Sequence, residues 1–349
     1  MTLTSQPRPD TERGVEPPAA LARARDIAQP ALQSAVSTMD NERMRTIASY
    51  QLGWCDADGN PTEGGGKSIR PALALLSAEA VLGSPGCGVP GAVAVELVHN
   101  FSLLHDDIMD GDLERRHRPT GWVAFGVGDA ILAGNAMLAL AVQVLLSSGI
   151  EGRRSLPLLM DTTQALISGQ SRDLGLEERG SVTLDEVLEM EAGKTAALLA
   201  CASSIGALSA GAPAHIVSGL ATFGHELGMA FQLVDDILGV VGDPAVTGKS
   251  SSSDVRAGKR SAPIVAALNS DSPAARRLAE LFAGGPPEEE HDIELATSLI
   301  GEAGGLGWAE RRADEHLNRA YEQLGALDLA DTATAQLTAV ASYIVTRDR

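Results

Sequence analysis

The hydrophobic pattern of the chain is helical over most of its length. Mostly apolar stretches run from 93 to 104, from 130 to 150 and from 195 to 220, and each is longer than an ordinary strand. No segment alternates between apolar and polar residues as a half-buried strand would. The breaks between these stretches are rich in glycine and proline, at 64–66, 83–86, 211–213 and 284–287. The pattern predicts a single all-α domain.

The uncharged stretch from 130 to 150 is long enough to cross a bilayer. Gly134, Asn135, Gln143 and two serines interrupt it, and much of the remainder is alanine. We therefore interpret this stretch, and the similar one from 195 to 220, as central helices of a thick helical domain that has no membrane span.

The first 35 residues differ from the rest because they are rich in proline, arginine, glutamate and threonine. Their prolines are Pro7, Pro9, Pro17, Pro18 and Pro30. This composition predicts a flexible extension over residues 1–35, followed by the helical domain over residues 36–349. The extension either binds a partner protein or is a disordered tag.

Composition and charge narrow the classes of function. The chain is 44% hydrophobic but only 3% aromatic, so its core must consist largely of alanine, leucine and valine. A net charge of -19 argues against nucleic acid as a partner, because phosphates would be repelled. Cys55, Cys87 and Cys201 have no paired spacing, and the N-terminus has no secretion signal pattern. We therefore expect a cytoplasmic protein.

A first group of carboxylates follows the apolar stretch that ends at Leu104. Asp106 and Asp110 are four residues apart, so on a helix both project from one face and can share one or two Mg2+ ions. Asp107 would point aside and support them. The alternative is an acidic helix end near solvent, but the preceding stretch is too apolar for a surface segment.

A second group, Asp235 and Asp236, also closes an apolar stretch. Four residues after Asp235 stands Gly239, and Asp243 lies two turns beyond Asp236. Alone this is a weaker metal site than the first. Placed across a cavity from Asp106, it could supply ligands to a third ion.

Three tripeptides of the form Gly-Lys-Ser or Gly-Lys-Thr invite comparison with a P-loop, which needs another glycine five residues before the Gly-Lys pair. Those positions hold Pro61, Leu188 and Asp243, and no strand precedes them, which excludes a P-loop. Several cations nevertheless lie near glycines. Any one of them is most simply a surface charge, but together with two carboxylate groups they suggest diphosphate binding. They are Lys67, Arg70, Arg115, Arg116, Lys194, Lys249 and Lys259.

Five segments together resemble one family. Residues 65–71 are similar to its Gly-Gly-Lys-x-x-Arg-Pro segment, and residues 106–110 with 115–120 resemble its first aspartate-rich motif. Residues 231–236, with Gly248-Lys249, Asp254 and Gly258-Lys259, resemble the second. The family is the trans-type polyprenyl diphosphate synthases of the helical isoprenoid synthase fold. The resemblance covers roughly residues 35 to 345.

The resemblance implies a role for each matching residue. It implies that two or three Mg2+ ions are bound by Asp106, Asp110 and Asp235, assisted by Asp107 and Asp236. It implies that isopentenyl diphosphate is held by Lys67, Arg70, His99 and Arg116. It implies that the allylic diphosphate is held by Arg115, Lys194, Thr195, Gln232, Lys249 and Lys259. His99 lies seven residues, two helical turns, before Asp106, which favours this role over that of a core histidine. A homodimer is also implied.

Three positions depart from the family pattern. Gly239 replaces the usual last aspartate of the second motif, which puts the number of metal ions in doubt more than activity. Ser68 replaces a common basic residue, and His117 replaces the usual glycine before Arg118. Both changes would weaken the hold on substrate modestly.

The chemistry of such a site explains its residue types. Cations that stabilise a departing diphosphate promote ionisation of the allylic substrate, and an apolar cavity keeps water from the carbocation. No protein nucleophile is needed, and the sequence offers no Ser/His/Asp or Cys/His arrangement for one. Phe101, five residues before Asp106 and beside the small Ser102, acts as the floor of that cavity or packs as core. Within the family, an aromatic residue with a small neighbour at this place resembles the pattern of geranylgeranyl diphosphate synthases. The resemblance therefore implies geranylgeranyl diphosphate as the product, with farnesyl diphosphate as the next candidate.

Two other functions remain open. A terpene cyclase of the same fold would share the first aspartate motif but would leave Lys67, Arg70 and Arg116 without a purpose. A non-catalytic subunit that binds prenyl diphosphates is the other alternative, and the proline-rich extension keeps it open.

Overall fold

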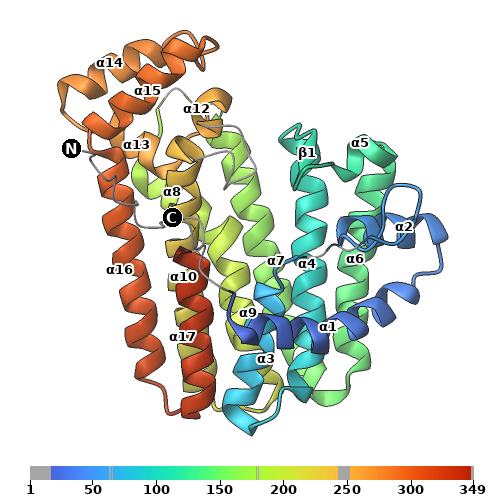
Figure 1. The fold of residues 1–349 in the computed structure, drawn as a ribbon. Coiled ribbons are helices and arrows are strands. Elements are labelled where there is room, and N and C mark those ends of the chain that lie inside the picture. The colour runs from blue at the N-terminus through green and yellow to red at the C-terminus, as the bar shows by residue number, and fades with distance from the viewer. Residues whose placement is uncertain are drawn as a thin grey trace, which may run out of the picture.

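The computed structural model describes residues 17–62, 64, 66–177, 179, 181–242 and 252–346. This part of the chain is almost entirely helical, as Figure 1 shows, and the predicted all-α class is confirmed. The N-terminal half comprises α1 (Ala19–Ser37), α2 (Glu42–Gln51), α3 (Ile69–Leu82), η1 (Gly86–Gly88), α4 (Val89–Met109), α5 (Gly121–Phe125), α6 (Val127–Ser147) and α7 (Gly149–Glu177). The remainder comprises α8 (Leu184–Glu191), the π-helical turn η2 (Ala192–Ala196), α9 (Ala197–Ser209), α10 (Ala214–Val241), α12 (Ser253–Ala257), α13 (Ala262–Leu268), α14 (Pro273–Phe282), α15 (Glu290–Glu302), α16 (Gly305–Gly325) and α17 (Asp331–Thr346).

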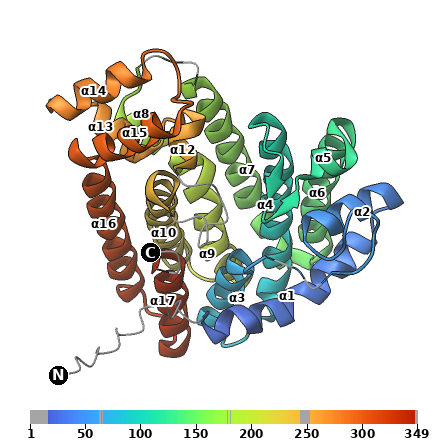
Figure 2. The same cartoon turned by 45° about the horizontal axis from the view of Figure 1, so that its top comes forward.

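The long helices form a bundle in which segments distant in sequence lie side by side. Helix α10 packs between α9 and α16, while α4 packs against α6 and α3 (Figures 1 and 2). Small residues allow the closest approaches: a Cβ on Gly206 of α9 would lie 1.8 Å from the Ala74 carbonyl oxygen of α3. A core rich in alanine, leucine and valine therefore packs tightly with few aromatic rings.

The predicted boundary at residue 35 is wrong. Helix α1 begins at Ala19 and crosses α3, α4 and α6, burying Leu21, Leu32 and Val36 in the main core. Arg23 of α1 also pairs with Glu79 of α3. Part of the stretch assigned to a flexible extension is thus an integral helix, and residues 1–16 lie outside the described part of the chain.

Helices α12 to α15 form a smaller layer over one end of the bundle (Figure 2). They have their own apolar cluster, in which Val255, Ile264, Leu278 and Leu299 are almost fully buried. Val240, near the end of α10, belongs to the same cluster and anchors this layer directly beyond the second aspartate pair.

Between α4 and α5 the chain forms a small hairpin that the hydrophobic pattern does not predict. Strands β1 (Glu114–Arg115) and β2 (Arg118–Pro119) pair antiparallel. The two turn residues, Arg116 and His117, have positive φ angles of 54° and 59°. Such two-residue turns normally contain glycine or asparagine. This backbone geometry explains why glycine is usual at position 117.

Two described helical segments are long and apolar enough to cross a membrane by length and composition alone: 86–109, which includes α4, and 127–147, which is α6. In the most apolar 18-residue stretch of each segment, 67% is buried in the first and 39% in the second. Helix α4 is therefore a core helix, whereas α6 presents one apolar face outward.

Candidate active site

The two aspartate groups lie at the ends of two bundle helices. Asp106 and Asp107 occupy the last turn of α4, and Asp110 follows as the residue that ends the helix. Asp235 and Asp236 lie near the end of α10. In the described part of the chain, no three His, Cys, Asp or Glu side chains converge closely enough to form a metal-binding group.

The charge of Asp110 affects the titration of Asp106. Burial is the main cause that raises the pKa of Asp106 to about 6; Asp110 raises it further, while Lys194 lowers it. Carboxylates that repel each other in a partly buried position are relieved by a cation. This part of the predicted site therefore suits a divalent metal, and hard oxygen ligands favour Mg2+.

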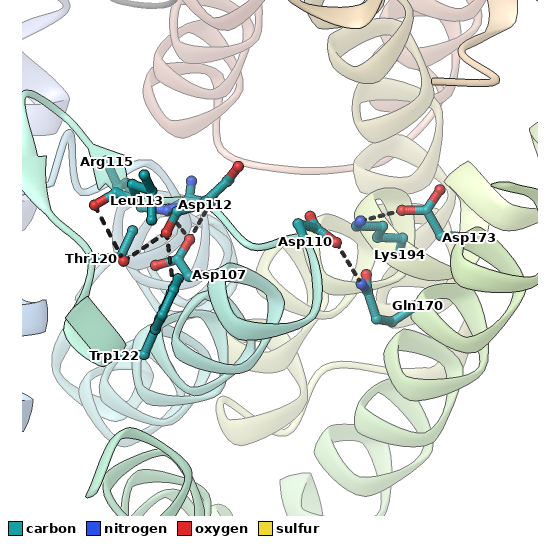
Figure 3. A network of polar contacts seen from close by, with 10 residues as sticks. All are labelled: Asp107, Asp110, Asp112, Leu113, Arg115, Thr120, Trp122, Gln170, Asp173 and Lys194. Carbon is teal, nitrogen blue, oxygen red and sulfur yellow. Dashed lines mark hydrogen bonds and ion pairs between the residues drawn. The ribbon is translucent and has the colours of Figure 1, made fainter. Parts of the chain in front are cut away.

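Asp107 differs from its neighbours because its side chain faces the hairpin. It is 1% exposed, and its Oδ1 accepts a hydrogen bond from the Nε of Arg115 at 2.6 Å. Figure 3 shows this pair apart from Asp110. The carbonyl of Asp112 accepts further bonds from Thr120 at 2.7 Å and Trp122 at 2.9 Å. Asp107 thus orients Arg115 and the loop, as expected for a residue that points aside.

Asp110 and Lys194 meet two residues of α7 that the sequence analysis missed. Gln170 donates a 3.5 Å hydrogen bond to Asp110, and Asp173 forms an ion pair with Lys194 (Figure 3). Gln170 and Asp173 are three residues apart and therefore share one helix face. This three-residue spacing was the only feature of the sequence that could have indicated their shared role.

A chain of hydrogen bonds runs from η2 to the second aspartate pair. Thr195 Oγ1 donates to Gln232 Oε1 at 2.6 Å, and Gln232 Nε2 donates to Asp236 Oδ1 at 2.7 Å. The backbone N–H of Ala262 donates to Asp236 Oδ2 at 2.9 Å. Asp236 is thus buried with both of its oxygens hydrogen-bonded, and the neighbouring Asp235 lies at the exposed surface of α10. This arrangement makes Asp235 the better placed of the two to bind an ion.

Glu191, the last residue of α8, is a buried carboxyl that the sequence analysis also missed. It is 1% exposed, and burial, followed by the charge of Asp236, raises its pKa well above the ordinary value. Asp236 itself has a pKa of about 6, raised mainly by burial and then by Asp254. A neutral Glu191 beside Asp236 avoids placing two negative charges together.

Lys259 lies among carboxylates of three different helices. Burial lowers its pKa, but Asp254, Asp110 and Asp173 together outweigh that effect and raise it. These carboxylates come from α12, the end of α4, and α7. A lysine charge is thus held where the two predicted motifs approach each other. Lys249 and Asp243 lie outside the described residues.

Three of the four residues predicted for isopentenyl diphosphate, Arg70, His99 and Arg116, also come together. Burial, followed by the charges of Arg70 and Arg116, lowers the pKa of His99 well below its ordinary value. His99 is therefore neutral near pH 7 and can donate a hydrogen bond without adding charge. Lys67 is exposed immediately before α3, while Arg70 lies in its first turn.

Glu96, one turn before His99, is a carboxylate in this cationic group that the sequence analysis also missed. Its Oε1 accepts a 3.1 Å hydrogen bond from Asn100. Burial raises its pKa, and the charges of Arg70 and Arg116 oppose that rise. A Cβ on Gly66 would lie 3.7 Å from Glu96 Oε1 and 3.8 Å from an Arg116 nitrogen. The loop at Gly66 therefore lies directly beside these charged groups.

A pocket of about 230 Å³ adjoins this group beneath the hairpin. Arg115, Arg116 and Arg118 line it, but Lys67, Arg70 and His99 do not. Arg118 is held by a 2.7 Å bond to the Cys55 carbonyl and stacks over Tyr50 at 4.2 Å. The pocket thus borders the predicted diphosphate site without enclosing it.

The structure explains the departure at Gly239. A Cβ at this position would lie 2.4 Å from the Asp254 carboxyl group. Asp254 is only 9% exposed. The side chain of α12 therefore occupies the space that the usual aspartate of α10 would need.

Comparison with known proteins identifies the family. The polyprenyl synthetase family model matches residues 59–300. The chain belongs to this family. It is 41% identical to a (2E,6E)-farnesyl diphosphate synthase of Mycobacterium tuberculosis over 98% of this chain and 96% of the relative. It is 46% identical to a geranylgeranyl diphosphate synthase of the same species over 88% of each chain. The chain is accordingly a trans-prenyl diphosphate synthase, a prenyltransferase.

Solved structures of family members share its fold. A polyprenyl synthetase from Streptomyces coelicolor superposes with a TM-score of 0.89 at 47% identity, covering 95% of this synthase and 100% of the other chain. A geranylgeranyl pyrophosphate synthase from Corynebacterium glutamicum, complexed with isoprenyl diphosphate and magnesium, has a TM-score of 0.81 at 28% identity, with 95% and 100% covered. The predicted isoprenoid synthase fold is thereby confirmed.

Proposed function

We propose that this synthase condenses isopentenyl diphosphate head-to-tail with an allylic diphosphate and releases mainly geranylgeranyl diphosphate. The observation that carries the proposal is the convergence of charges at the ends of α4 and α10. Lys194 and Lys259 lie among carboxylates of both motifs, while Arg70, Arg116 and neutral His99 form a separate cationic group. Two diphosphates with different roles require two such groups.

Asp106, Asp110 and Asp235 would hold Mg2+ in this proposal, with Asp107 and Asp236 positioning their surroundings. When bound, the metal would neutralise the allylic diphosphate as it leaves. The magnesium in the Corynebacterium glutamicum relative supports this assignment. The number of ions, two or three, depends on whether Asp254 replaces the missing aspartate at position 239.

The allylic diphosphate would lie between the motifs, held by Lys194, Lys259 and Lys249, with Thr195, Gln232 and Arg115 fixing the surrounding polar network. These cations stabilise charge on the departing group. Isopentenyl diphosphate would be held by Lys67, Arg70, His99 and Arg116. Its double bond would attack the allylic carbon, and the proton lost from it would pass to the released diphosphate.

The growing chain would descend along α4 toward Phe101 and Ser102, each 6% exposed. Ser102 turns inward on its own helix, donating a 2.8 Å hydrogen bond to the His99 carbonyl. Phe101 therefore provides most of the bulk at this level. An aromatic floor at this level supports geranylgeranyl diphosphate as the product. One mycobacterial relative is a geranylgeranyl diphosphate synthase and the other is a farnesyl diphosphate synthase, so farnesyl diphosphate is the competing product.

Product analysis tests the proposal. Purified enzyme would be incubated with Mg2+, isopentenyl diphosphate and dimethylallyl, geranyl or farnesyl diphosphate in turn. Elongation to a geranylgeranyl product is expected, and Phe101→Ala should lengthen it. A cyclic hydrocarbon would instead identify a terpene cyclase, and absence of turnover would indicate a binding subunit. An unchanged product from Phe101→Ala would show that Phe101 does not limit product length.

The exposed face of α6 supports a homodimer. Val127, Ile131, Leu132 and Leu146 are 40–57% exposed along this helix. Monomers rarely expose several large apolar side chains on one helix face to water. We place the dimer contact here, in a cytoplasmic enzyme, and leave the N-terminal residues as the candidate site for another protein. Leu132→Glu should yield a monomer in sedimentation velocity; an unchanged dimer would place the contact elsewhere.

A further inference from the structure

The ring of His105 packs against Phe101, the proposed floor of the product cavity. It is in the last turn of α4, one turn after Phe101 and immediately before Asp106. The rings of His105 and Phe101 meet edge to face, with centroids 5.0 Å apart and planes inclined by 76°. This geometry is favourable for aromatic pairs and restricts both rings.

Helix α6 fixes the other edge of the His105 ring. Its Nε2 lies 3.1 Å from the carbonyl oxygen of Ile131, so this nitrogen carries the proton and donates it. Gly134, one turn further along α6, forms the notch that receives the ring. A Cβ on Gly134 would lie 2.4 Å from Nε2 and 2.7 Å from the neighbouring ring carbon. No residue larger than glycine fits there without displacing the histidine.

The three residues therefore form a stack from α6 to the product cavity: Gly134, then His105, then Phe101. Phe101 is 6% exposed and can yield to a longer product only by moving its ring into other space. His105 fills the space toward α6. Since close-packed side chains resist displacement, the rigidity of the floor depends on the His105 ring that packs against it.

We propose that His105, seated in the Gly134 notch, is a specificity-determining residue that sets product length by holding Phe101 in place. The proposal rests on the assignment of Phe101 as the floor under "Proposed function". His105 acts through Phe101 and needs no contact with the diphosphates, so it is a positioning residue. Its effect should appear in the length of the product rather than in substrate affinity.

Two substitutions perturb the stack from opposite sides. His105→Ala empties the space behind Phe101, so the ring can retreat and the main product should lengthen by at least one isoprene unit. Gly134→Ala leaves His105 present but inserts a methyl group at 2.4 Å, where ordinary contact begins at 3.4 Å. It should push the ring toward Phe101 and shift the products toward shorter chains.

Gly128→Ala is the matched control, because Gly128 lies on the same helix and an added Cβ there meets no atom within 4 Å. Product lengths of the wild type, Phe101→Ala, His105→Ala, Gly134→Ala and Gly128→Ala would be compared by mass spectrometry, together with the KM for each substrate. The expected result is longer products from His105→Ala, shorter ones from Gly134→Ala and no change from Gly128→Ala.

The outcomes separate this inference from the function on which it rests. If Phe101→Ala lengthens the product while His105→Ala and Gly134→Ala match the wild type, the stack does not set product length and the inference is overturned. If Phe101→Ala also has no effect, the floor itself is refuted. If His105→Ala fails to fold, the shift expected from Gly134→Ala relative to Gly128→Ala still decides the question.

Discussion

Restoring the usual aspartate at position 239 should damage the enzyme. Family resemblance alone would suggest that Gly239→Asp completes the second metal motif and raises activity. In the structure, however, the space above Gly239 is filled by the carboxyl group of Asp254, 2.4 Å from where a Cβ would lie. Ordinary contact begins at 3.4 Å, so even alanine requires a displacement of 1.0 Å.

The magnitude follows from the surroundings of Asp254. Overpacking a close-packed site typically costs about 1–3 kcal/mol. Replacing glycine by alanine within a helix recovers up to about 1 kcal/mol. We therefore expect Gly239→Ala to lower the free energy of unfolding by up to about 2 kcal/mol. Gly239→Asp should lower it further, because the new carboxylate would lie among Asp254 and the buried Asp236.

Urea unfolding and elongation rates measured over a range of Mg2+ concentrations would check both effects. Gly325→Ala is the control, since Gly325 ends a long helix and an added Cβ meets nothing within 4 Å. Gly239→Asp should show reduced stability and a higher Mg2+ requirement. A Gly239→Asp enzyme that is as stable as the wild type and needs less Mg2+ would refute the reasoning.

Three further predictions concern strain, protonation and thiol reactivity. His117→Gly should stabilise the protein by about 1 kcal/mol in urea unfolding, because the left-handed conformation at φ 59° is unfavourable for a side-chain-bearing residue; no gain would show that the turn is unstrained. Asp106 has a pKa raised to about 6, so its carboxyl takes up a proton as the pH falls through 6, and Mg2+ must then compete with that proton. The Mg2+ concentration for half-maximal rate should therefore rise about tenfold between pH 7 and pH 5, and a constant value would argue against Asp106 as a ligand. Cys201 is buried, which raises its pKa to about 12, so mass spectrometry after iodoacetamide treatment should find it unmodified in native protein and modified after unfolding.

The helical architecture was predictable because long apolar stretches leave few alternatives. The same reasoning failed for α1, where composition suggested disorder. Ala20, Ala24, Ala28, Leu32 and Val36 recur every four residues and form one buried stripe, and Pro30 lies within the helix without ending it. Periodicity was the better guide there than the number of prolines and charges.

The site was predictable only where its residues are close in sequence. The spacing of Asp106 and Asp110 indicated a shared face, and it is consistent with the effect of Asp110 on the pKa of Asp106. Gln170, Asp173 and Glu191 could not be assigned, because only tertiary packing brings α7 and α8 to the aspartates. The Asp254 side chain of α12 occupies the space beside Gly239 of α10. This contact also depends on tertiary packing, so the sequence around either residue does not predict it.

The central claim is that Asp106 belongs to the group of carboxylates that makes Mg2+-dependent elongation possible. The most direct test is the initial rate of isopentenyl diphosphate incorporation by Asp106→Asn, with the exposed Asp161→Asn on α7 as control and urea unfolding measured for both. We predict a loss on the order of 10²–10³-fold or more for Asp106→Asn, with stability retained, and a wild-type rate for Asp161→Asn. A stable Asp106→Asn enzyme that elongates at the wild-type rate and with the wild-type Mg2+ requirement would contradict the account.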